Sequence, residues 1–270
     1  RYGIAGTGTN TAALAITGHP DRSINESWNG SAWTEVGDTN TGRTASAAAG
    51  TTTEGLVFGG ANAKANTEFW NGSSWTEVAD LATGRQKLAG NGTSVAGLAS
   101  GGESPTTAST EEFTQASSPV LVEGMIFLSA GTTLKGFGKA AGIPAATWAS
   151  GGALNTGRSG PGKGTQGTQT AAMACGGFTP PVATNVEQYN GSSWTEIAEI
   201  NTARSNTSTV GTNTAALVAS GYVGTPSATL VTENWNGSSW TEVGDLSTGR
   251  STGVGVGTST AMLAVGGTPS

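Results

Sequence analysis

The sequence predicts an all-β fold, a β-propeller of about six four-stranded blades, from three observations. A segment of 18 residues recurs along the chain, 44 of the 270 residues are Gly, and only 11% are charged. Gly costs about 1 kcal/mol per helix position relative to Ala, which disfavours a helical bundle. The glycines do not fall at every third position, which excludes collagen, and the eight regularly spaced Trp argue against disorder. Repeats of this length with four short strands are typical of propeller blades.

The repeat is clearest as ENWNGSSWTEVGDLSTGR at residues 233–250, with related copies at 26–43, 68–85 and 187–204. Another copy ends at Arg158, with its first half replaced. Because each copy ends in Arg, the blade units are about 1–42, 43–84, 85–157, 158–203, 204–249 and 250–270. Residues 1–270 are therefore interpreted as one propeller domain, with five complete blades and a partial sixth that begins at Arg250.

Each unit contains signals for four strands in order. After the Arg, a run of small residues such as 44–49 predicts an innermost strand a, and an alternating apolar run such as 55–58 predicts strand b, which usually ends at a Gly pair. A variable connection follows, and then an Asn-Gly turn between aromatic runs predicts strands c and d. Small residues suit inner strands that converge on an axis. The large aromatic residues are expected to pack between blades; on strand d these are Trp33, Trp75, Trp148, Trp194 and Trp240.

The repeat arginines are expected to occupy the same structural position in every unit. They are Arg43, Arg85, Arg158, Arg204 and Arg250, and Arg1 has the same spacing. We expect each to pair with the Glu of a neighbouring Thr-Glu motif. A ring of arginines that binds an anionic ligand is the alternative.

The third unit carries an insertion, residues 114–146, in place of its Asn-Gly turn. Its run 120–138 alternates apolar residues around a Gly-containing turn at 129–132, which predicts an added hairpin. We expect this hairpin to dock the propeller onto a neighbouring molecule; packing against its own propeller is the alternative. The apolar residues of this predicted docking surface are Met125, Ile126, Phe127, Leu128, Leu134 and Phe137.

The b–c connections are the main candidates for a binding surface. In an antiparallel blade they emerge on the same face as the d–a connections, and they vary in length and content at about 19–25, 61–66, 103–109, 178–185 and 222–231. Variable loops on a rigid scaffold are typical of recognition surfaces, although neutral drift produces the same variation. The candidate ligand-binding residues on this face are His19, Asp21, Arg22, Lys64, Phe178 and Tyr222.

Composition disfavours several classes of function. With one Cys, Cys175, and one His, His19, the chain cannot form an intrachain disulfide or a usual His/Cys metal site, so no cofactor and no metal are expected. A net charge of −6 disfavours nucleic acid as a partner. The longest apolar stretch, 120–130, is too short to cross a bilayer. No nucleophile with a nearby base emerges, so the sequence favours a protein that is not an enzyme.

The consensus sequence of the repeat, WNGSSWTEV…TGR…GTxTAALAxGG, resembles that of the kelch-like β-propellers. In particular, it resembles repeats of tail-fibre and other virion structural proteins of marine phages of the cyanophage type. The first and fifth units depart from this pattern in lacking the Gly doublet. The resemblance implies a location on the surface of a virion, other virion proteins or further copies of the chain as partners, and a role as an adhesin for host-surface glycans. A virion decoration or assembly protein without a ligand is the second interpretation, and a polysaccharide-degrading enzyme is the third.

The sixth unit presents an open question of architecture. Propellers usually complete the last blade with strands from the other terminus, but this sequence runs from strand a of the first unit to strand b of the sixth. Strands c and d of that blade are expected to come from sequence upstream of Arg1; another chain, or no completion at all, is the alternative.

Overall fold

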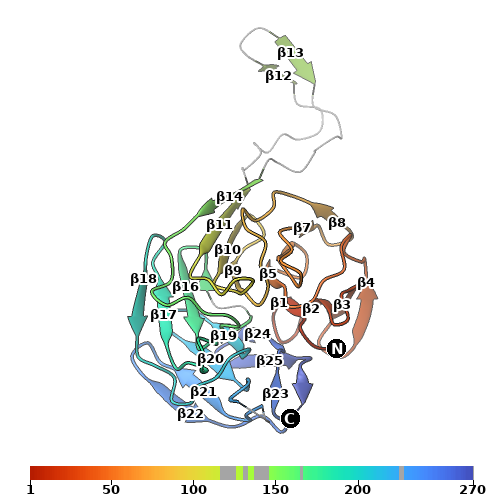
Figure 1. Ribbon diagram of the computed structural model, residues 1–270. Helices are drawn as coiled ribbons and strands as arrows, with labels where there is room; N and C mark the ends of the chain where they lie inside the picture. The colour runs from red at the N-terminus through yellow and green to blue at the C-terminus, as the bar shows by residue number, and fades with distance from the viewer. Residues whose placement is uncertain (116–125, 130–132, 137–145, 165–166, 225–227, 270) are drawn as a thin grey trace.

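The computed structural model is an all-β propeller whose blades surround a central axis (Figure 1). It describes residues 1–115, 126–129, 133–136, 146–164, 167–224 and 228–269. Five four-stranded antiparallel sheets form the complete blades, which confirms the predicted fold class. Within each blade the chain runs outward from strand a at the axis to strand d at the rim.

The strands of the blades are as follows. Blade 1 holds β1 (Ala5–Gly8), β2 (Ala13–Gly18), β3 (Arg22–Trp28) and β4 (Trp33–Val36); blade 2 holds β5 (Ala47–Gly50), β6 (Gly55–Phe58), β7 (Thr67–Trp70) and β8 (Trp75–Glu77). Blade 3 holds β9 (Ala89–Gly92), β10 (Ala96–Ser100), β11 (Thr110–Gln115) and β14 (Ala146–Ser150); blade 4 holds β15 (Gly167–Thr168), β16 (Ala171–Cys175), β17 (Val186–Tyr189) and β18 (Trp194–Ile197). Blade 5 holds β19 (Ser208–Gly211), β20 (Ala216–Ala219), β21 (Thr232–Trp235) and β22 (Trp240–Val243).

The sixth unit contains an inner pair of strands, β24 (Val254–Thr258) and β25 (Ala261–Val265). A second, short pair, β23 (Arg250–Ser251) and β26 (Thr268–Pro269), lies at its base. Strand β24 contacts β19 of blade 5 on one side and β1 of blade 1 on the other. The sixth unit therefore completes the inner circle of strands.

A ring of six backbone hydrogen bonds closes the propeller around its axis. In every unit, the residue two positions after the repeat Arg donates its N–H to the carbonyl of the equivalent residue in the preceding unit, at 2.7 to 3.1 Å. All six residues have φ between 51° and 64°, a left-handed conformation that turns the peptide toward its neighbour. We call these residues the axial ring: Gly3, Ala45, Lys87, Gly160, Asn206 and Thr252. Because the bond from Gly3 to Thr252 joins the first unit to the sixth, the ring has no break.

The hydrophobic core consists of layers between neighbouring blades. Leu14 and Ile16 of blade 1, for example, pack against Val57 and Trp75 of blade 2. The aromatic residues of strands c and d form tilted pairs, with ring centroids 5.2 Å apart for Trp70 and Trp75. Similar layers join blades 2 and 3, 3 and 4, and 4 and 5.

The strand-d Trp of a blade anchors it to the preceding blade. Trp75 Nε1 donates to the carbonyl of Gly37, just after the outer strand of blade 1, at 3.0 Å. Trp240 donates in the same way to Ala198 of blade 4, at 2.9 Å. Each aromatic pair therefore faces the blade before it, as the interblade packing prediction requires.

Buried Arg–Glu pairs fasten the d–a connections to the next blade. Arg43 pairs with Glu68 of β7 and donates to the carbonyls of Gly59 and Asn66 at 3.2 and 2.7 Å. The Glu68 carboxylate also accepts the backbone N–H of Asn40, in the connection that leaves blade 1. Three further Arg–Glu ion pairs lie at the equivalent positions: Arg85–Glu111, Arg158–Glu187 and Arg204–Glu233. In the Arg85–Glu111 pair, the guanidinium makes no hydrogen bond to a described residue. These side chains are at most 6% exposed, so the pairs are part of the scaffold.

The insertion of the third unit lies where the sequence predicts, between strands c and d. Strands β11 and β14 pair with Phe113 opposite Trp148, and β12 (Ile126–Ser129) pairs with β13 (Thr133–Gly136) as a hairpin. Figure 1 shows this hairpin outside the circle of blades. Met125 and Phe137 of the predicted docking surface lie outside the described residues.

Candidate functional site

The face that carries the b–c connections holds a second six-membered ring of residues. The residue immediately after each repeat Arg pairs with the backbone of a residue just beyond strand b: His19 donates to Tyr2 at 2.8 Å, and Phe178 and Ser159 exchange two hydrogen bonds at 2.7 and 3.1 Å. Equivalent pairings occur in all six units. The residues beyond strand b, which we call the mouth ring, are His19, Ala61, Glu103, Phe178, Tyr222 and Thr268.

The mouth ring surrounds the axial ring, because each of its partners is adjacent in sequence to an axial-ring residue. Its six backbone positions are equivalent, but its side chains share no chemistry. Phe178 is 38% exposed, and the imidazole of His19 stacks on Tyr2 with ring centroids 4.5 Å apart and planes 18° apart. Three of the six candidate ligand-binding residues, His19, Phe178 and Tyr222, therefore occupy equivalent positions around one opening.

The other three candidates lie at the edge of this face. Lys64 Nζ lies 3.2 Å from Asp21 Oδ2, so the first two b–c connections are joined by an ion pair. The prediction that Arg22 lies in a loop is wrong. Strand β3 begins at Arg22, which pairs with Gly18 because the first b–c connection needs only the turn at residues 19–21.

A pair of charges that the sequence analysis did not single out also lies at the mouth. Lys87 of the axial ring lies 2.8 Å from the carboxylate of Glu103 in the mouth ring, and Gln86 donates to the same carboxylate at 3.0 Å. Two ion pairs therefore lie around the opening, Lys87–Glu103 and Lys64–Asp21.

Below the mouth, the central axis is filled by a backbone segment of the fourth unit. The Lys163 carbonyl accepts hydrogen bonds from Thr209 of blade 5 at 2.9 Å and from Gly255 of the sixth unit at 3.2 Å. Residues 163 and 164 also form parallel bridges to Ser208 and Gly255. The segment therefore reaches from blade 4 to the inner strands of blade 5 and of the sixth unit.

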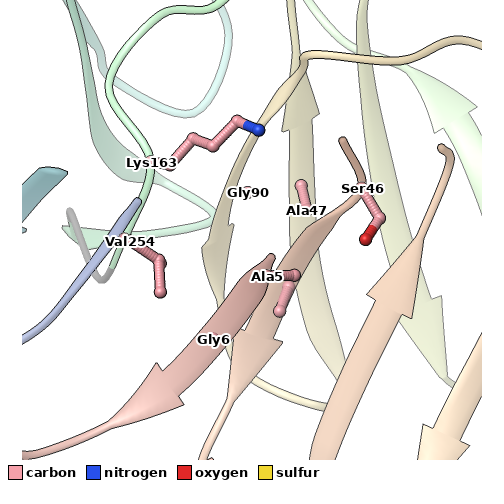
Figure 2. A pocket seen from close by; sticks show the side chains of 9 residues that line it. Ala5, Gly6, Ser46, Ala47, Gly90, Lys163 and Val254 are labelled. Atoms are coloured by element: carbon pink, nitrogen blue, oxygen red, sulfur yellow. The ribbon is translucent and has the colours of Figure 1, made fainter. Parts of the chain in front are cut away.

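Among the described residues at this level of the axis, Lys163 is the only one with a large charged side chain. The residue five positions after the repeat Arg is small in the other units: Gly6, Ala48, Gly90, Thr209 and Gly255. Figure 2 shows the Lys163 side chain extending across the axial pocket toward Gly90, with Ser46, Ala47 and Ala5 also lining that pocket. A Cβ at Gly90 would lie 2.5 Å from the Ala48 carbonyl oxygen, so the wall has no space for a side chain at this position.

Burial changes the acid–base behaviour of Lys163. The residue is 4% exposed, and no described residue lies within hydrogen-bonding or ion-pairing distance of its ammonium group. Desolvation lowers its pKa to about 8; the positive charge of Lys87 acts in the same direction and Glu103 opposes it.

The single cysteine of the chain, Cys175, is buried. Burial raises the pKa of the Cys175 thiol to about 12, which suits a small core residue.

Within the described ranges, no group of three or more His, Cys, Asp or Glu side chains could hold a metal ion. In the same part of the chain, no helix is long and apolar enough to cross a membrane.

Comparisons with known proteins support the fold. No family model and no curated protein matches the chain. The chain is similar to a solved structure titled "Structure of YjhT", with a TM-score of 0.70 and 14% sequence identity. The match covers 100% of this chain and 91% of the other. At this identity the similarity establishes the β-propeller and nothing about the ligand.

Sequence reasoning missed Tyr2, Lys87, Glu103 and Lys163. Tyr2 and Lys87 could have been found by aligning the six units on their repeat arginines, because they lie one and two positions after the Arg. Glu103 lies directly after the Gly pair that ends strand b, so an alignment on the Gly pairs indicates it. For Lys163, the alignment on the arginines shows a Lys where five units have a small residue. The position of that residue on the axis requires the structure.

Proposed function

We propose that this chain is a non-enzymatic recognition module whose mouth ring binds a glycan on a host surface. The observation that carries the proposal is the mouth ring itself, in which six equivalent backbone positions present six different side chains. Outer strands and turns repeat nearly unchanged, whereas this ring varies. Variation limited to one ring of a constant scaffold is typical of a binding surface.

The chemistry of the ring fits a carbohydrate. The stacked rings of Tyr2 and His19 and the exposed ring of Phe178 offer flat apolar surfaces on which the C–H faces of a sugar can stack. The carboxylates of Glu103 and Asp21, which belong to b–c connections on the same face, can accept hydrogen bonds from sugar hydroxyls. The proposed setting is a virion of the phage type, as the resemblance of the repeat implies.

A role in virion assembly without a ligand is the second candidate. The observation that favours it is the hairpin of β12 and β13, which pairs with no strand of a blade in the described part of the chain. Such a hairpin suits contact with another virion protein or with a second copy of the chain.

Simultaneous replacement of His19, Phe178 and Tyr222 by Ala tests the proposed function. We expect at least a tenfold loss of affinity for purified host-envelope polysaccharide, about 1.4 kcal/mol or more, because three contact surfaces are removed. Biolayer interferometry measures the affinity, and an adsorption assay with particles carrying the variant measures the effect on the virion. Thermal unfolding verifies that the scaffold is intact.

Val95→Ser is the matched control. Val95 is 48% exposed and lies in an a–b turn, on the opposite face of the propeller. We expect this variant to bind as the parent does. If the triple variant retains full affinity and adsorption, the glycan-binding proposal is wrong and the assembly role is favoured.

A further inference from the structure

Lys163 differs from the other buried cations of the scaffold in having no carboxylate partner. In the part of the chain that the structure describes, the buried cationic side chains are Arg43, Arg85, Arg158, Arg204 and Lys163. Each of the four arginines has a buried Glu within 3.2 Å. A buried charge without a partner is costly. The Lys163 ammonium group is therefore a position at which the scaffold lacks a counter-charge.

The strands around the axial pocket cannot supply that counter-charge. The inner strands β1, β5, β9, β19 and β24 contain no Asp or Glu. The two charges that act on Lys163 are those of Lys87, which is repulsive, and Glu103. Glu103 already pairs with Lys87, at 2.8 Å. A full counter-charge for Lys163 has to come from solution.

The inner strands direct backbone N–H groups toward the axis at the level of Lys163. Thr209 of β19 lies opposite a residue of β20, yet it donates its N–H to the Lys163 carbonyl at 2.9 Å. Its pair with β20 is therefore of the non-hydrogen-bonded kind, in which the backbone groups point away from the partner strand. Gly6, Ala48 and Gly90 have the same register with their own strands b and line the axial pocket. Their N–H groups, like their carbonyl groups, therefore face the pocket.

The pocket has room for a single small particle. The centre of a water-sized particle can reach about 10 Å³ of it, which is about the space that one water molecule needs. The Lys163 side chain extends across this space toward Gly90 (Figure 2). Phosphate, a carboxylate or a sugar is too large to enter.

We propose that the axial pocket binds one halide ion, chloride in physiological salt, between the Lys163 ammonium group and the inward backbone N–H groups of blades 1 to 3. The ion supplies the counter-charge that the inner strands lack, and hydrogen bonds to charged groups are stronger than those between neutral groups. It joins the fourth unit, which carries Lys163, to the three blades on the other side of the pocket.

The chemistry of the pocket selects a halide over other small occupants. The positive charge of Lys163 excludes a metal cation. A water molecule fits and can accept a hydrogen bond from the ammonium group, but it leaves the buried charge uncompensated. A monatomic anion is close to water in size, needs no particular orientation and carries the missing charge.

A bromide titration of the 270-residue chain at pH 7 tests the proposal, with sodium methanesulfonate keeping the ionic strength constant. The methanesulfonate anion is too large for the pocket. We expect the unfolding temperature to rise saturably with bromide, by about 3 °C or more at ten times the dissociation constant. Lys163→Met is expected to abolish the rise. In methanesulfonate alone this variant is expected to unfold at a higher temperature than the parent, and bromide is expected to narrow the difference.

Lys64→Met is the matched control, because it removes a Lys that lies outside the axial pocket and pairs with Asp21. We expect it to keep the full bromide response. A saturable response of the same size in Lys163→Met, or no saturable response in the parent, overturns the proposal.

The anomalous scattering of bromide locates the ion directly. In crystals of the parent grown in sodium bromide, we expect an anomalous peak within hydrogen-bonding distance of Lys163 Nζ, and no such peak in Lys163→Met. Density in the axial pocket without an anomalous signal would identify the occupant as water and overturn the proposal.

Discussion

Replacing Glu233 by Gln is expected to destabilise the propeller by about 3 to 5 kcal/mol, because the change leaves the buried guanidinium of Arg204 without its counter-charge. Both side chains are fully buried. Glu233 also accepts the backbone N–H of Asn201 at 2.7 Å, so the substitution weakens the connection between blades 4 and 5 as well. Urea unfolding followed by Trp fluorescence measures the loss.

Glu26→Gln is the matched control for this prediction, since the chain contains an exposed copy of the same ion pair. Arg1 and Glu26 are 17% and 40% exposed, and pairs in such surroundings contribute about 0 to 1 kcal/mol. We expect a change in that range for the control. Equal effects of the two substitutions would show that burial does not determine the contribution of the pair.

Replacing Lys163 by Met is expected to raise the free energy of unfolding at pH 7 by about 3 kcal/mol. The lowering of its pKa from 10.5 to about 8 corresponds to about 1.4 kcal/mol per pKa unit. Below pH 8 both the folded and the unfolded chain carry the proton, so the whole cost of the buried charge is present. Met has a similar length and needs no hydrogen-bond partner. Denaturant unfolding at pH 7 measures the gain.

The same group predicts a pH dependence for the parent protein. Between pH 8 and 10.5 the folded chain loses the Lys163 proton before the unfolded chain does, so the unfolded state binds more protons and stability rises with pH. The Met variant is expected to lack this rise. Lys64→Met is the control, because Lys64 pairs with Asp21 and its charge is not among the causes of the Lys163 shift. A parent whose stability does not rise between pH 8 and 10.5 would contradict the account of Lys163.

Much of the scaffold could be predicted because the same sequence pattern recurs in several units. The strands on either side of the Asn-Gly turn, the interblade packing of Trp75 and Trp240 and the pairing of Arg204 with Glu233 follow from a pattern seen several times in the chain. The extent of the first b–c loop could not be predicted. Nothing in the residues shows that Arg22 already belongs to a strand, because its side chain fits a loop as well as a strand end.

The axial ring could not be predicted from the residues. It requires a left-handed backbone at one position of every unit, and Ala45, Lys87, Asn206 and Thr252 adopt it at φ between 51° and 60°. Non-glycine residues rarely do so, and no pattern in the sequence indicates it. Six cooperating hydrogen bonds around the axis offset the local strain.

The position of the proposed binding face follows from this closure. Since the axial ring fixes the backbone next to the hydrogen-bond partner of each mouth-ring residue, we expect substitutions at His19 or Phe178 to change the chemistry of the opening without changing its backbone. The scaffold is therefore constant where blades pack together and variable where a ligand can reach.

Amide hydrogen exchange of the sixth unit in the 270-residue chain tests the central claim most directly, namely that the six inner strands close the propeller. Within the described residues, β25 pairs with β24 alone and has a free outer edge. We expect the amides of β24 and of Thr252 to exchange as slowly as those of β1 and β5, because they belong to the closed inner circle. The β25 amides that do not bond to β24 are expected to exchange orders of magnitude faster than those of β6, which lies between two strands. If β24 exchanges as fast as the open edge of β25, the inner circle is not closed and the account is wrong.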